Sequence, residues 1–499
     1  MRASVFSLGY FDLRKYQEAS NHMGRLQSSK RNLDTSGVGI HQRFSNTIRR
    51  LRSSQRNPHK KLHSLHIARV TSRTTIMEKT SKFTSYQKLV IALLALTQFT
   101  VVLDFMVISP LGAFLMRALS LKPSQFGLVV SVYAFSAGIS GFLTAGFADR
   151  FDRKKLLLFF YIGFILGTGF CGIANSYASL LAGRLITGLF GGVIGSTSMA
   201  IVTDLFPLQQ RGRVMGFLQM GFAASQVLGI PIGLYLAELW GWQSPFWMVV
   251  AVAVIVIILV ATRMRPVNMH LALQKDKAPL LHLWHTIKKR NYRIGLTATG
   301  ILSIGGFMMM PFGSAFAMNN LLVKEEQLKL LFFVAGIGSF ITMPLVGKLS
   351  DKFDKYRLFL IATLFTAVLV ITYTNLGPQP LWFIMMFNIV MMASIFARIV
   401  PATALASAIP DMQDRGAYMS INSSLQQIAG GVGAWAAGSI VVQATTTSPL
   451  QHYNTLGLVV VTISFIAAGL MFRVDKMIKG RKAPPKTQPT EDFVPAIEN

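Results

Sequence analysis

The stretch that decides the fold is Ala145-Gly-Phe-Ala-Asp-Arg-Phe-Asp-Arg-Lys-Lys155, a short charged turn between two apolar runs. It occurs again, at an offset of 202 residues, as Gly347-Lys-Leu-Ser-Asp-Lys-Phe-Asp-Lys-Tyr-Arg357, with Asp351 and Asp354 in the places of Asp149 and Asp152. Other landmarks recur at offsets of 201 to 204 residues: Pro110-Leu-Gly112 with Pro311-Phe-Gly313, Pro207 with Pro410, and Arg211-Gly212 with Arg415-Gly416. Several landmarks at nearly one offset indicate a duplicated half.

The composition places these repeats in a membrane. The chain has 499 residues, of which 52% are hydrophobic and 14% charged, and its apolar residues gather in runs of about 20, the length that spans a bilayer as a helix. Twelve such runs are present, six before and six after a charged connector at 263–293. We therefore expect an all-α membrane protein with twelve transmembrane helices in two six-helix pseudo-repeats, at 77–262 and 294–473, and a tail at 474–499.

Lysine and arginine set the orientation. From residue 77 onward, the N-terminal segment, the connector, the tail and the loops on the same side carry 28 of these residues, whereas the opposite loops carry four. Basic loops remain in the cytoplasm, so we expect both termini and the connector to be cytoplasmic and the protein to lie in a cell (inner) membrane. Much of the net charge of +29 is then topological, and no nucleic-acid partner is expected.

Metal, cofactor and enzyme chemistry find no support in the sequence. The single cysteine, Cys171, lies in an apolar run and excludes an intramolecular disulfide. His282 and His285 in the connector have no further ligand nearby, and the chain lacks a phosphate-binding Gly-x4-Gly-Lys-Ser/Thr motif. The helical spacing of apolar residues between Leu280 and Ile287, beside Lys288, indicates instead a basic amphipathic helix on the inner membrane surface.

The first 76 residues differ from the rest of the chain. They hold 15 Lys and Arg against three acidic residues, many serines and no apolar run, a composition that cannot bury a core. They resemble a disordered basic leader or an organellar transit segment and lack the apolar region of a secretory signal. The other interpretation is a mis-assigned start, with Met77 as the true first residue.

Two charged residues interrupt the apolar runs, Asp104 in the first helix and Arg184 in the fourth. A charge in lipid is costly, so each should face a partner or a wet cavity. At a rise of about 1.5 Å per residue, both lie about 10–15 Å below the outer surface and can meet. The repeat places Gly305 where the first half has Asp104, so the carboxylate exists in one half only.

Two interpretations of Asp104 and Arg184 remain open. The pair is either a static ion pair that fixes helix packing, or a coupling site. In a coupling site, Asp104 takes up and releases a proton as access alternates, and Arg184 favours the charged carboxylate in one state and releases it in the other. We favour coupling, because a purely architectural residue would be expected in both halves.

The expected substrate cavity is apolar and rich in methionine. Methionine is flexible and polarizable, which suits a promiscuous pocket, although Met-rich helices also pack against lipid or core. A third intramembrane charge, in the tenth helix, either binds an anionic group or reaches toward the inner surface. The predicted cavity residues are Gln98, Met308, Met309, Met310, Phe312, Asn388, Met392 and Arg398. Bending or close packing of the fifth helix is expected at Gly229, Pro231 and Gly233.

These features resemble the major facilitator superfamily, specifically its twelve-helix drug:proton antiporter branch, over about residues 85–499. The family pattern in the doubled turn is Gly-x-Leu-Ala-Asp-Arg-x-Gly-Arg-Lys. The first copy matches it at Asp149, Arg150, Arg153 and Lys154 and departs from it at Ala145, Phe147 and Asp152. The second copy keeps Gly347, Leu349, Asp351, Lys352 and Lys355. The resemblance implies a cytoplasmic latch in which Asp149 faces the start of the eleventh helix, with Arg153 and Asp204 in a charge relay and Arg150, Asp351 and Lys355 beside them.

The resemblance also bears on function. Arg184-Leu-Ile-Thr-Gly188 matches the family's fourth-helix pattern Arg-x-x-x-Gly, which is linked to proton transfer, whereas Gly229-Ile-Pro231-Ile-Gly233 only approximates the antiporter pattern of the fifth helix. We expect a monomeric, proton-coupled secondary transporter that exports lipophilic or drug-like small molecules by alternating access, with the lipid bilayer as its other partner. The alternatives are a sugar or metabolite carrier of the same superfamily and a non-transporting membrane receptor.

Overall fold

The computed structural model describes residues 83–144, 147–268, 271, 279–411 and 414–480. The expected leader at 1–76 and most of the tail lie outside these residues. The described part is helical and contains no β-strand, only one isolated bridge between Val442 and Gln451. The expected domain boundaries, which separate the leader, the two six-helix bundles, the connector and the tail, stay a prediction.

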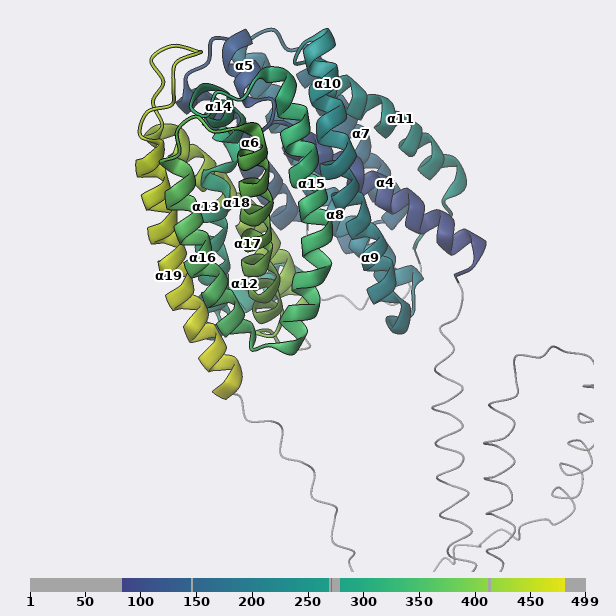
Figure 1. Ribbon diagram of the computed structural model, residues 1–499. Coiled ribbons are helices and arrows are strands. Elements are labelled where there is room, and N and C mark those ends of the chain that lie inside the picture. The colour runs from purple at the N-terminus through teal and green to yellow at the C-terminus, as the bar shows by residue number, and fades with distance from the viewer. Residues whose placement is uncertain (1–82, 145–146, 269–270, 272–278, 412–413, 481–499) are drawn as a thin grey trace, which may run out of the picture. The chain divides into compact units, whose positions relative to one another are not determined.

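The helices follow the duplicated order (Figure 1). In the first half they are α4 (Ser85–Val107), α5 (Gly112–Ala118), α6 (Pro123–Thr144), α7 (Arg153–Gly172), α8 (Tyr177–Leu205), α9 (Leu208–Ala224), α10 (Ile230–Trp240) and α11 (Ser244–Arg263). The connector forms α12 (Pro279–Lys288). In the second half they are α13 (Arg290–Met308), α14 (Gly313–Asn319), α15 (Glu325–Lys352), α16 (Lys355–Thr374), α17 (Leu381–Ser407), α18 (Arg415–Ile440) and α19 (Tyr453–Gly480).

The first span of each half is broken at the same repeated sequence. Proline has no backbone N–H and cannot continue a helix without losing a hydrogen bond. Accordingly, α4 ends at Val107 before Pro110, and α13 ends at Met308 before a 3-10 turn at Met310–Phe312 that contains Pro311. The two breaks face each other, because the Ser314 hydroxyl donates to the Ser109 carbonyl (2.8 Å) and the Ser109 hydroxyl donates to the Met310 carbonyl.

Eleven described helices are long and apolar enough to cross a membrane. The remaining expected span, near 417–443 and eleventh in chain order, is α18, which is helical over 26 residues but is not among those eleven candidates. It packs against α6 of the first half and α13 of the second, so its sides face protein more than lipid. A helix enclosed in this way can carry polar side chains without exposing them to hydrocarbon.

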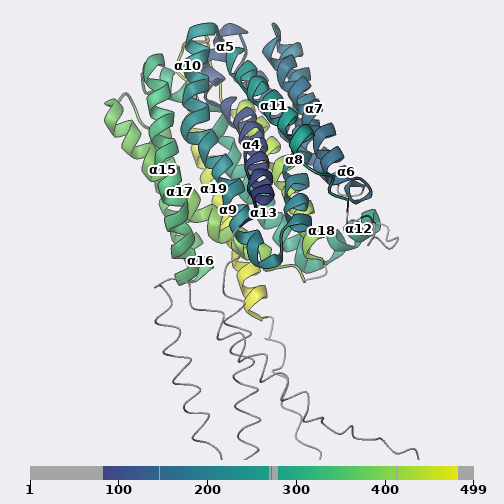
Figure 2. The same cartoon turned by 90° about the vertical axis from the view of Figure 1, so that its right-hand side faces the viewer.

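Close backbone contact joins the two halves along α6 and α18. A Cβ atom added at Gly127 would lie 2.8 Å from the Ala434 carbonyl oxygen, and one added at Gly138 would lie 2.7 Å from that of Ser424. Small residues at such crossings let helix backbones approach closely. Near the inner end of the same helix, α12 packs against α18 (Figure 2).

The fifth span contains a π-helical turn, Ser225–Gly229, between α9 and α10. Single π turns inside α-helices are uncommon and often occur at functional sites. The turn ends at Gly229, two residues before Pro231, and a Cβ atom at Gly229 would lie 2.6 Å from Leu103 Cδ1 in α4. Gly229 thus lies in an irregular, tightly packed turn, whereas Pro231 and Gly233 belong to α10. Bending of the fifth span at these residues stays a prediction.

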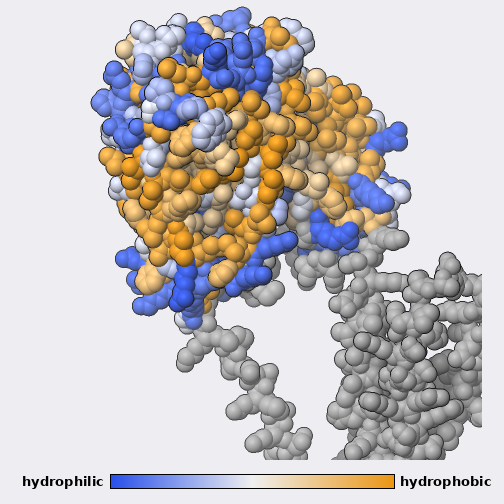
Figure 3. All heavy atoms as spheres, in the orientation of Figure 1, coloured by the Kyte–Doolittle hydropathy of each residue, from blue (hydrophilic) through white to orange (hydrophobic). Residues whose placement is uncertain are grey.

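On the face that Figure 3 shows, apolar residues cover the middle of the described helices and hydrophilic residues lie toward both ends. Many large apolar side chains of the described helices are exposed, for example Leu166 at 66% and Ile361 at 65%. In water such surface would be costly. It is the surface expected of helices that contact lipid.

Candidate functional site: a buried ion pair between gates

The structure brings Asp104 and Arg184 together inside the first half. Arg184 Nη1 donates to Asp104 Oδ2 at 2.9 Å, and both side chains are fully buried. The Thr168 hydroxyl of α7 donates to the other carboxylate oxygen at 3.2 Å. The carboxylate is thus held by two helices other than its own, as a buried charge requires if it is to remain charged.

The guanidinium has a second neighbour on α6. Arg184 Cζ lies 4.4 Å from the centroid of the Tyr133 ring, which is 2% exposed. Arg184 Nε and Nη2 are buried and have no hydrogen-bond partner among the described residues. The neighbours of Arg184 therefore include one carboxylate and one aromatic face, with the Cys171 thiol of α7 also close by.

Sequence reasoning missed Thr168 and Tyr133. Both are neutral residues within apolar runs, and neither interrupts the hydrophobic pattern. The only signal was the glycine spacing of the fourth helix, because a Cβ atom at Gly188 would collide with the Tyr133 carbonyl oxygen and one at Gly192 would collide with Ala137. That spacing indicates a close neighbour but does not identify it.

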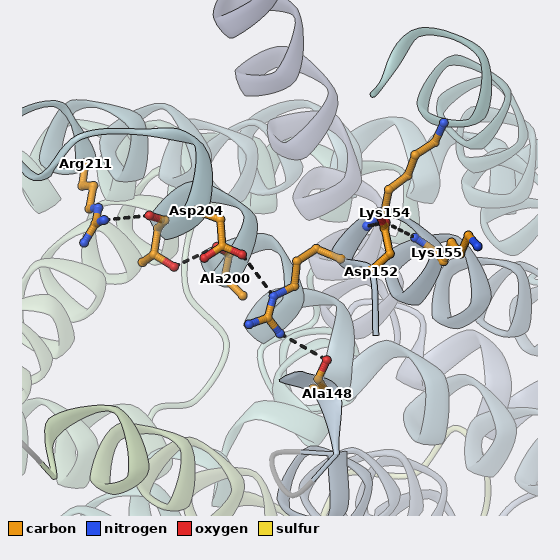
Figure 4. Close-up of polar contacts among 9 residues, drawn as sticks. Ala148, Asp152, Lys154, Lys155, Ala200, Asp204 and Arg211 are labelled. Carbon is orange, nitrogen blue, oxygen red and sulfur yellow. Dashed lines mark hydrogen bonds and ion pairs between the residues drawn. The ribbon is translucent and has the colours of Figure 1, made fainter. Parts of the chain in front are cut away.

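At the end of the bundle that carries the first charged turn, two residues of the expected relay, Arg153 and Asp204, are in contact (Figure 4). Arg153 Nε donates to Asp204 Oδ2 at 3.3 Å, and Arg153 Nη1 donates to the Ala148 carbonyl at 3.3 Å. Arg211 donates to the carbonyl of Thr203 at 2.6 Å and to that of Phe206 at 2.9 Å. These contacts fix the inner end of α8 against the start of α7 and α9.

The structure shows no ion pair for the other predicted latch residues among those whose side chains it describes. The side chains of Asp149 and Asp351 lie outside the described residues, so the expected contact of Asp149 with the eleventh helix stays a prediction. Arg150 is exposed and Lys355 is half-buried. Within the described part of the chain, neither forms an ion pair.

A second inner cluster, not predicted from the sequence, lies in the second half. The Tyr292 hydroxyl donates to Asp414 at 2.8 Å and to Asp411 at 3.1 Å, and Lys289 forms an ion pair with Asp414. The hydrogen bond to Asp414 raises the pKa of Lys289. These contacts join the starts of α13 and α18.

Two ion pairs join the halves at the end of the bundle away from the charged turns. Arg117 Nη2 pairs with Glu325 Oε2 at 2.8 Å, and Lys329 Nζ pairs with Glu238 Oε2 at 2.7 Å. These pairs lie at the same end of the bundle as the hydrogen bonds between the two helix breaks. The sequence did not reveal them, because isolated charges near helix ends carry no information about their partners.

The predicted cavity residues do not all occupy similar places. Met308 and Phe312 are buried at 1% and 0% exposure, whereas Gln98, Met309, Met310, Asn388 and Met392 are half-buried. The Asn388 amide donates to its own helix, at the Ile384 carbonyl. Arg398 does not reach toward the surface, because it is 8% exposed and donates to the Ser464 hydroxyl at 3.0 Å.

Comparisons with known proteins agree with this fold. The sequence matches the Major Facilitator Superfamily over residues 94–434 and 295–498. It is 27% identical over 259 residues to the uncharacterized MFS-type transporter YwfA of Bacillus subtilis, covering 52% of this chain and 63% of that protein. It is 25% identical over 240 residues to a probable sugar efflux transporter of Helicobacter acinonychis, covering 48% and 60%. The chain thus spans less than two thirds of the length of these relatives.

Among solved structures, the crystal structure of a bacterial homolog of the human lysosomal transporter Spinster, inward-facing and unoccupied, matches with a TM-score of 0.65. The match covers 81% of this chain and 100% of that one at 18% identity, so it speaks for the fold alone. Two six-helix repeats with a charged turn in each define a multi-pass membrane protein of the transporter class. The chain belongs to the Major Facilitator Superfamily. This is a family of transporters and not of enzymes.

Proposed function

We propose that this protein is a proton-coupled secondary transporter that exports lipophilic small molecules by alternating access, as members of the drug:proton antiporter branch do. The observation that carries the proposal is the buried ion pair of Asp104 and Arg184. It stands inside the first half, and the corresponding position of the second half is Gly305.

The coupling follows from the cost of leaving a buried charge alone. Protonation of Asp104 removes the negative partner of Arg184, whose side chain is fully buried. Removing one partner of a buried pair costs about 3–5 kcal/mol, which is a factor of at least 100 in an equilibrium constant at about 1.4 kcal/mol per tenfold change. A proton on Asp104 therefore favours any rearrangement that hydrates Arg184 or gives it a new partner.

The charge clusters at the two ends act as alternating gates in this proposal. The Arg117–Glu325 and Lys329–Glu238 pairs join the halves at the outer end and must separate for outward opening. At the inner end, the Arg153–Asp204 pair, with Arg150, Asp149, Asp351 and Lys355, forms the latch that holds the inward-closed state. Both sets of contacts are present in this structure, so the proposal requires that each set separates when its own end opens.

An apolar substrate is supported by the residues proposed to line the cavity. Met309, Met310 and Met392 are half-buried and can adapt to different shapes. Gln98 and Asn388 add hydrogen-bonding groups. This combination of soft apolar side chains with few polar groups suits drug-like compounds better than sugars, which need many hydrogen bonds.

A sugar or metabolite carrier is the second candidate, and the similarity to a probable sugar efflux transporter favours it. Saturable movement of one polar solute, with no effect on dye accumulation, would support this candidate. A membrane receptor predicts no solute flux in proteoliposomes. In either transport case we propose a monomer in the inner membrane with both ends of the chain in the cytoplasm.

The test is export of a panel of lipophilic dyes and sugars from proteoliposomes under an imposed pH gradient. We expect dye export that depends on the gradient and is lost in Asp104→Asn. Asp354→Asn removes a carboxylate from the inner surface and is the matched control; it should retain coupling. Gradient-driven dye export that is unchanged in Asp104→Asn would refute the assignment of Asp104.

A further inference from the structure

The residue that supports the arginine of the ion pair from the other side is Tyr133. Its ring lies 4.4 Å from Arg184 Cζ, with the ring itself buried in α6. The two guanidinium nitrogens that do not bond Asp104, Nε and Nη2, have no hydrogen-bond partner in the described part of the chain. Apart from the neutral Cys171 thiol, the aromatic face of Tyr133 is therefore the group beside Asp104 that stabilises the cation.

The strength of this cation–π contact depends on whether Asp104 is ionised or protonated. A cation over an aromatic ring is attracted by the ring quadrupole, most strongly when both are removed from water. While Asp104 is ionised, its carboxylate satisfies most of the guanidinium charge. Once Asp104 is neutral, the full positive charge acts on the ring alone, so the cation–π contact gains strength as the ion pair is lost.

We propose that Tyr133 is a positioning residue for proton coupling, which holds the Arg184 cation in place when Asp104 takes up a proton. This inference rests on the proposed role of Asp104. It explains how a buried arginine without a second carboxylate tolerates the protonated state long enough for the protein to change conformation.

The ring is fixed in place by packing and connected to the other half. Gly188 and Gly191 of α8 leave room for Tyr133, and a Cβ atom at Gly191 would lie 3.0 Å from the Tyr133 hydroxyl. Phe105, next to Asp104 in sequence, has its ring centroid 5.2 Å from that of Tyr133 and 5.9 Å from that of Phe307. Phe307 immediately precedes Met308, where α13 ends. The contacts from Tyr133 through Phe105 to Phe307 therefore connect the ion pair to the helix break of the second half.

The groups that face the pair come from two helices, α6 and α7, that pack beside α4 and α8. Thr168 and Cys171 stand on α7, and Tyr133 stands on α6; among the described residues these are the side chains that act on Asp104 or Arg184. Tyr133 and Cys171 carry a proton at neutral pH, because their ordinary pKa values are about 10 and 8.5. Of these groups, Asp104 is therefore the one that we propose to exchange a proton during coupling.

The experiment measures the pH midpoint of gradient-driven dye export in proteoliposomes. Tyr133→Leu removes the ring and with it the cation–π contact. The state with neutral Asp104 and charged Arg184 is then destabilised, and Asp104 binds its proton less tightly. We expect the midpoint to move to lower pH by about one unit. Tyr133→Phe keeps the ring and loses only the hydroxyl, and it should restore the wild-type midpoint. Tyr161→Leu removes another buried tyrosine of the same half that contacts Thr100 and not Arg184, and it is the matched control.

Tyr133→Met fills a similar volume without an aromatic face and replaces the leucine variant if that variant does not fold. A midpoint in Tyr133→Leu or Tyr133→Met equal to that of wild type would overturn the inference. So would a shift of equal size in Tyr161→Leu or in Tyr133→Phe. Asp104→Asn is measured in parallel: if it keeps gradient-driven export, the proposed function fails, and if it abolishes export while the Tyr133 variants titrate like wild type, only the role of Tyr133 fails.

Discussion

Asp152 and Asp354 occupy the same position in the two copies of the charged turn, and each caps the helix that follows it. Asp152 Oδ1 accepts from the backbone N–H groups of Lys154 (2.8 Å) and Lys155 (3.1 Å) at the start of α7, and Asp354 Oδ1 accepts from that of Arg357 (2.9 Å) at the start of α16. A carboxylate at this place satisfies N–H groups that have no partner within the helix. The family pattern has glycine here, so this chain gains a cap where the pattern has none.

The caps should contribute measurably to stability. Replacing Asp152 by Ala removes the acceptor for two N–H groups and should lower the free energy of unfolding by about 1 kcal/mol. Asp152→Asn keeps a side-chain oxygen and should lose much less. Thermal unfolding of the purified protein in detergent measures both. Equal losses in the two variants would show that the charge, and not the cap, matters at this position.

The cap in the second turn should make the stability of the fold depend on pH. Lys479 Nζ donates to Asp354 Oδ2 at 2.7 Å, and this hydrogen bond holds the pKa of Asp354 below its ordinary value of 3.8. A carboxyl whose pKa is lower in the folded state stabilises the fold above its unfolded pKa, and this contribution is lost as the pH falls through the folded value. Asp354→Asn should therefore reduce the melting temperature at pH 7, and the difference from wild type should shrink below pH 3.8. A constant difference across that range would contradict the assignment.

The buried ion pair should behave as a unit. Arg184→Leu leaves an unpaired carboxylate and Asp104→Leu leaves an unpaired guanidinium, so each single change should destabilise the fold by about 3–5 kcal/mol. The double variant removes both charges and should be more stable than either single variant. Unfolding midpoints of the four proteins form a double-mutant cycle. Additive losses would mean that the two charges do not stabilise each other.

The outer ion pair should bias the conformational equilibrium. Arg117 and Glu325 are about one third exposed, so their attraction contributes about 0.2–1 kcal/mol. Ser314→Cys in a Cys171→Ala background places a single cysteine where the two helix breaks meet. Its labelling by a membrane-impermeant maleimide reports whether the two halves separate there. Arg117→Glu should speed labelling several-fold, and Arg117→Glu combined with Glu325→Arg should reverse the effect. Unchanged labelling in the single variant would exclude a gating role.

The glycine contact between α6 and α8 can be tested against a glycine that has free space. Gly188→Ala brings a Cβ atom into the Tyr133 carbonyl and should cost about 1–3 kcal/mol. Gly216→Ala, in α9, meets no atom within 4 Å and should be neutral or slightly stabilising. Expression level and melting temperature in detergent distinguish the two. Similar behaviour of both variants would argue against tight helix packing at Gly188.

The fold could be predicted from the sequence because its signals are one-dimensional. Apolar runs, the charged turns and their offset follow from the order of residues alone. The meeting of Asp104 and Arg184 was also predictable, because each charge breaks an apolar run and both lie at one depth. Thr168 and Tyr133 could not be found in this way, since a neutral residue in an apolar run reveals neither its direction nor its neighbours. The span expected near 417–443 is also a helix, α18, although it is not among the eleven apolar spans. Its polar side chains lower its hydropathy, and they are tolerated because α6 and α13 pack against it.

The polar character of α18 has a consequence for biosynthesis. Its residues Asn422, Ser424 and Gln426 make it a poor candidate to leave the translocon for lipid by itself, because each polar side chain raises the cost of insertion. Its packing partner α6 is made much earlier in synthesis, and α13 also precedes it. We expect α18 to enter the bilayer by joining helices that are already there, so that membrane integration of the second half depends on the first half having been inserted.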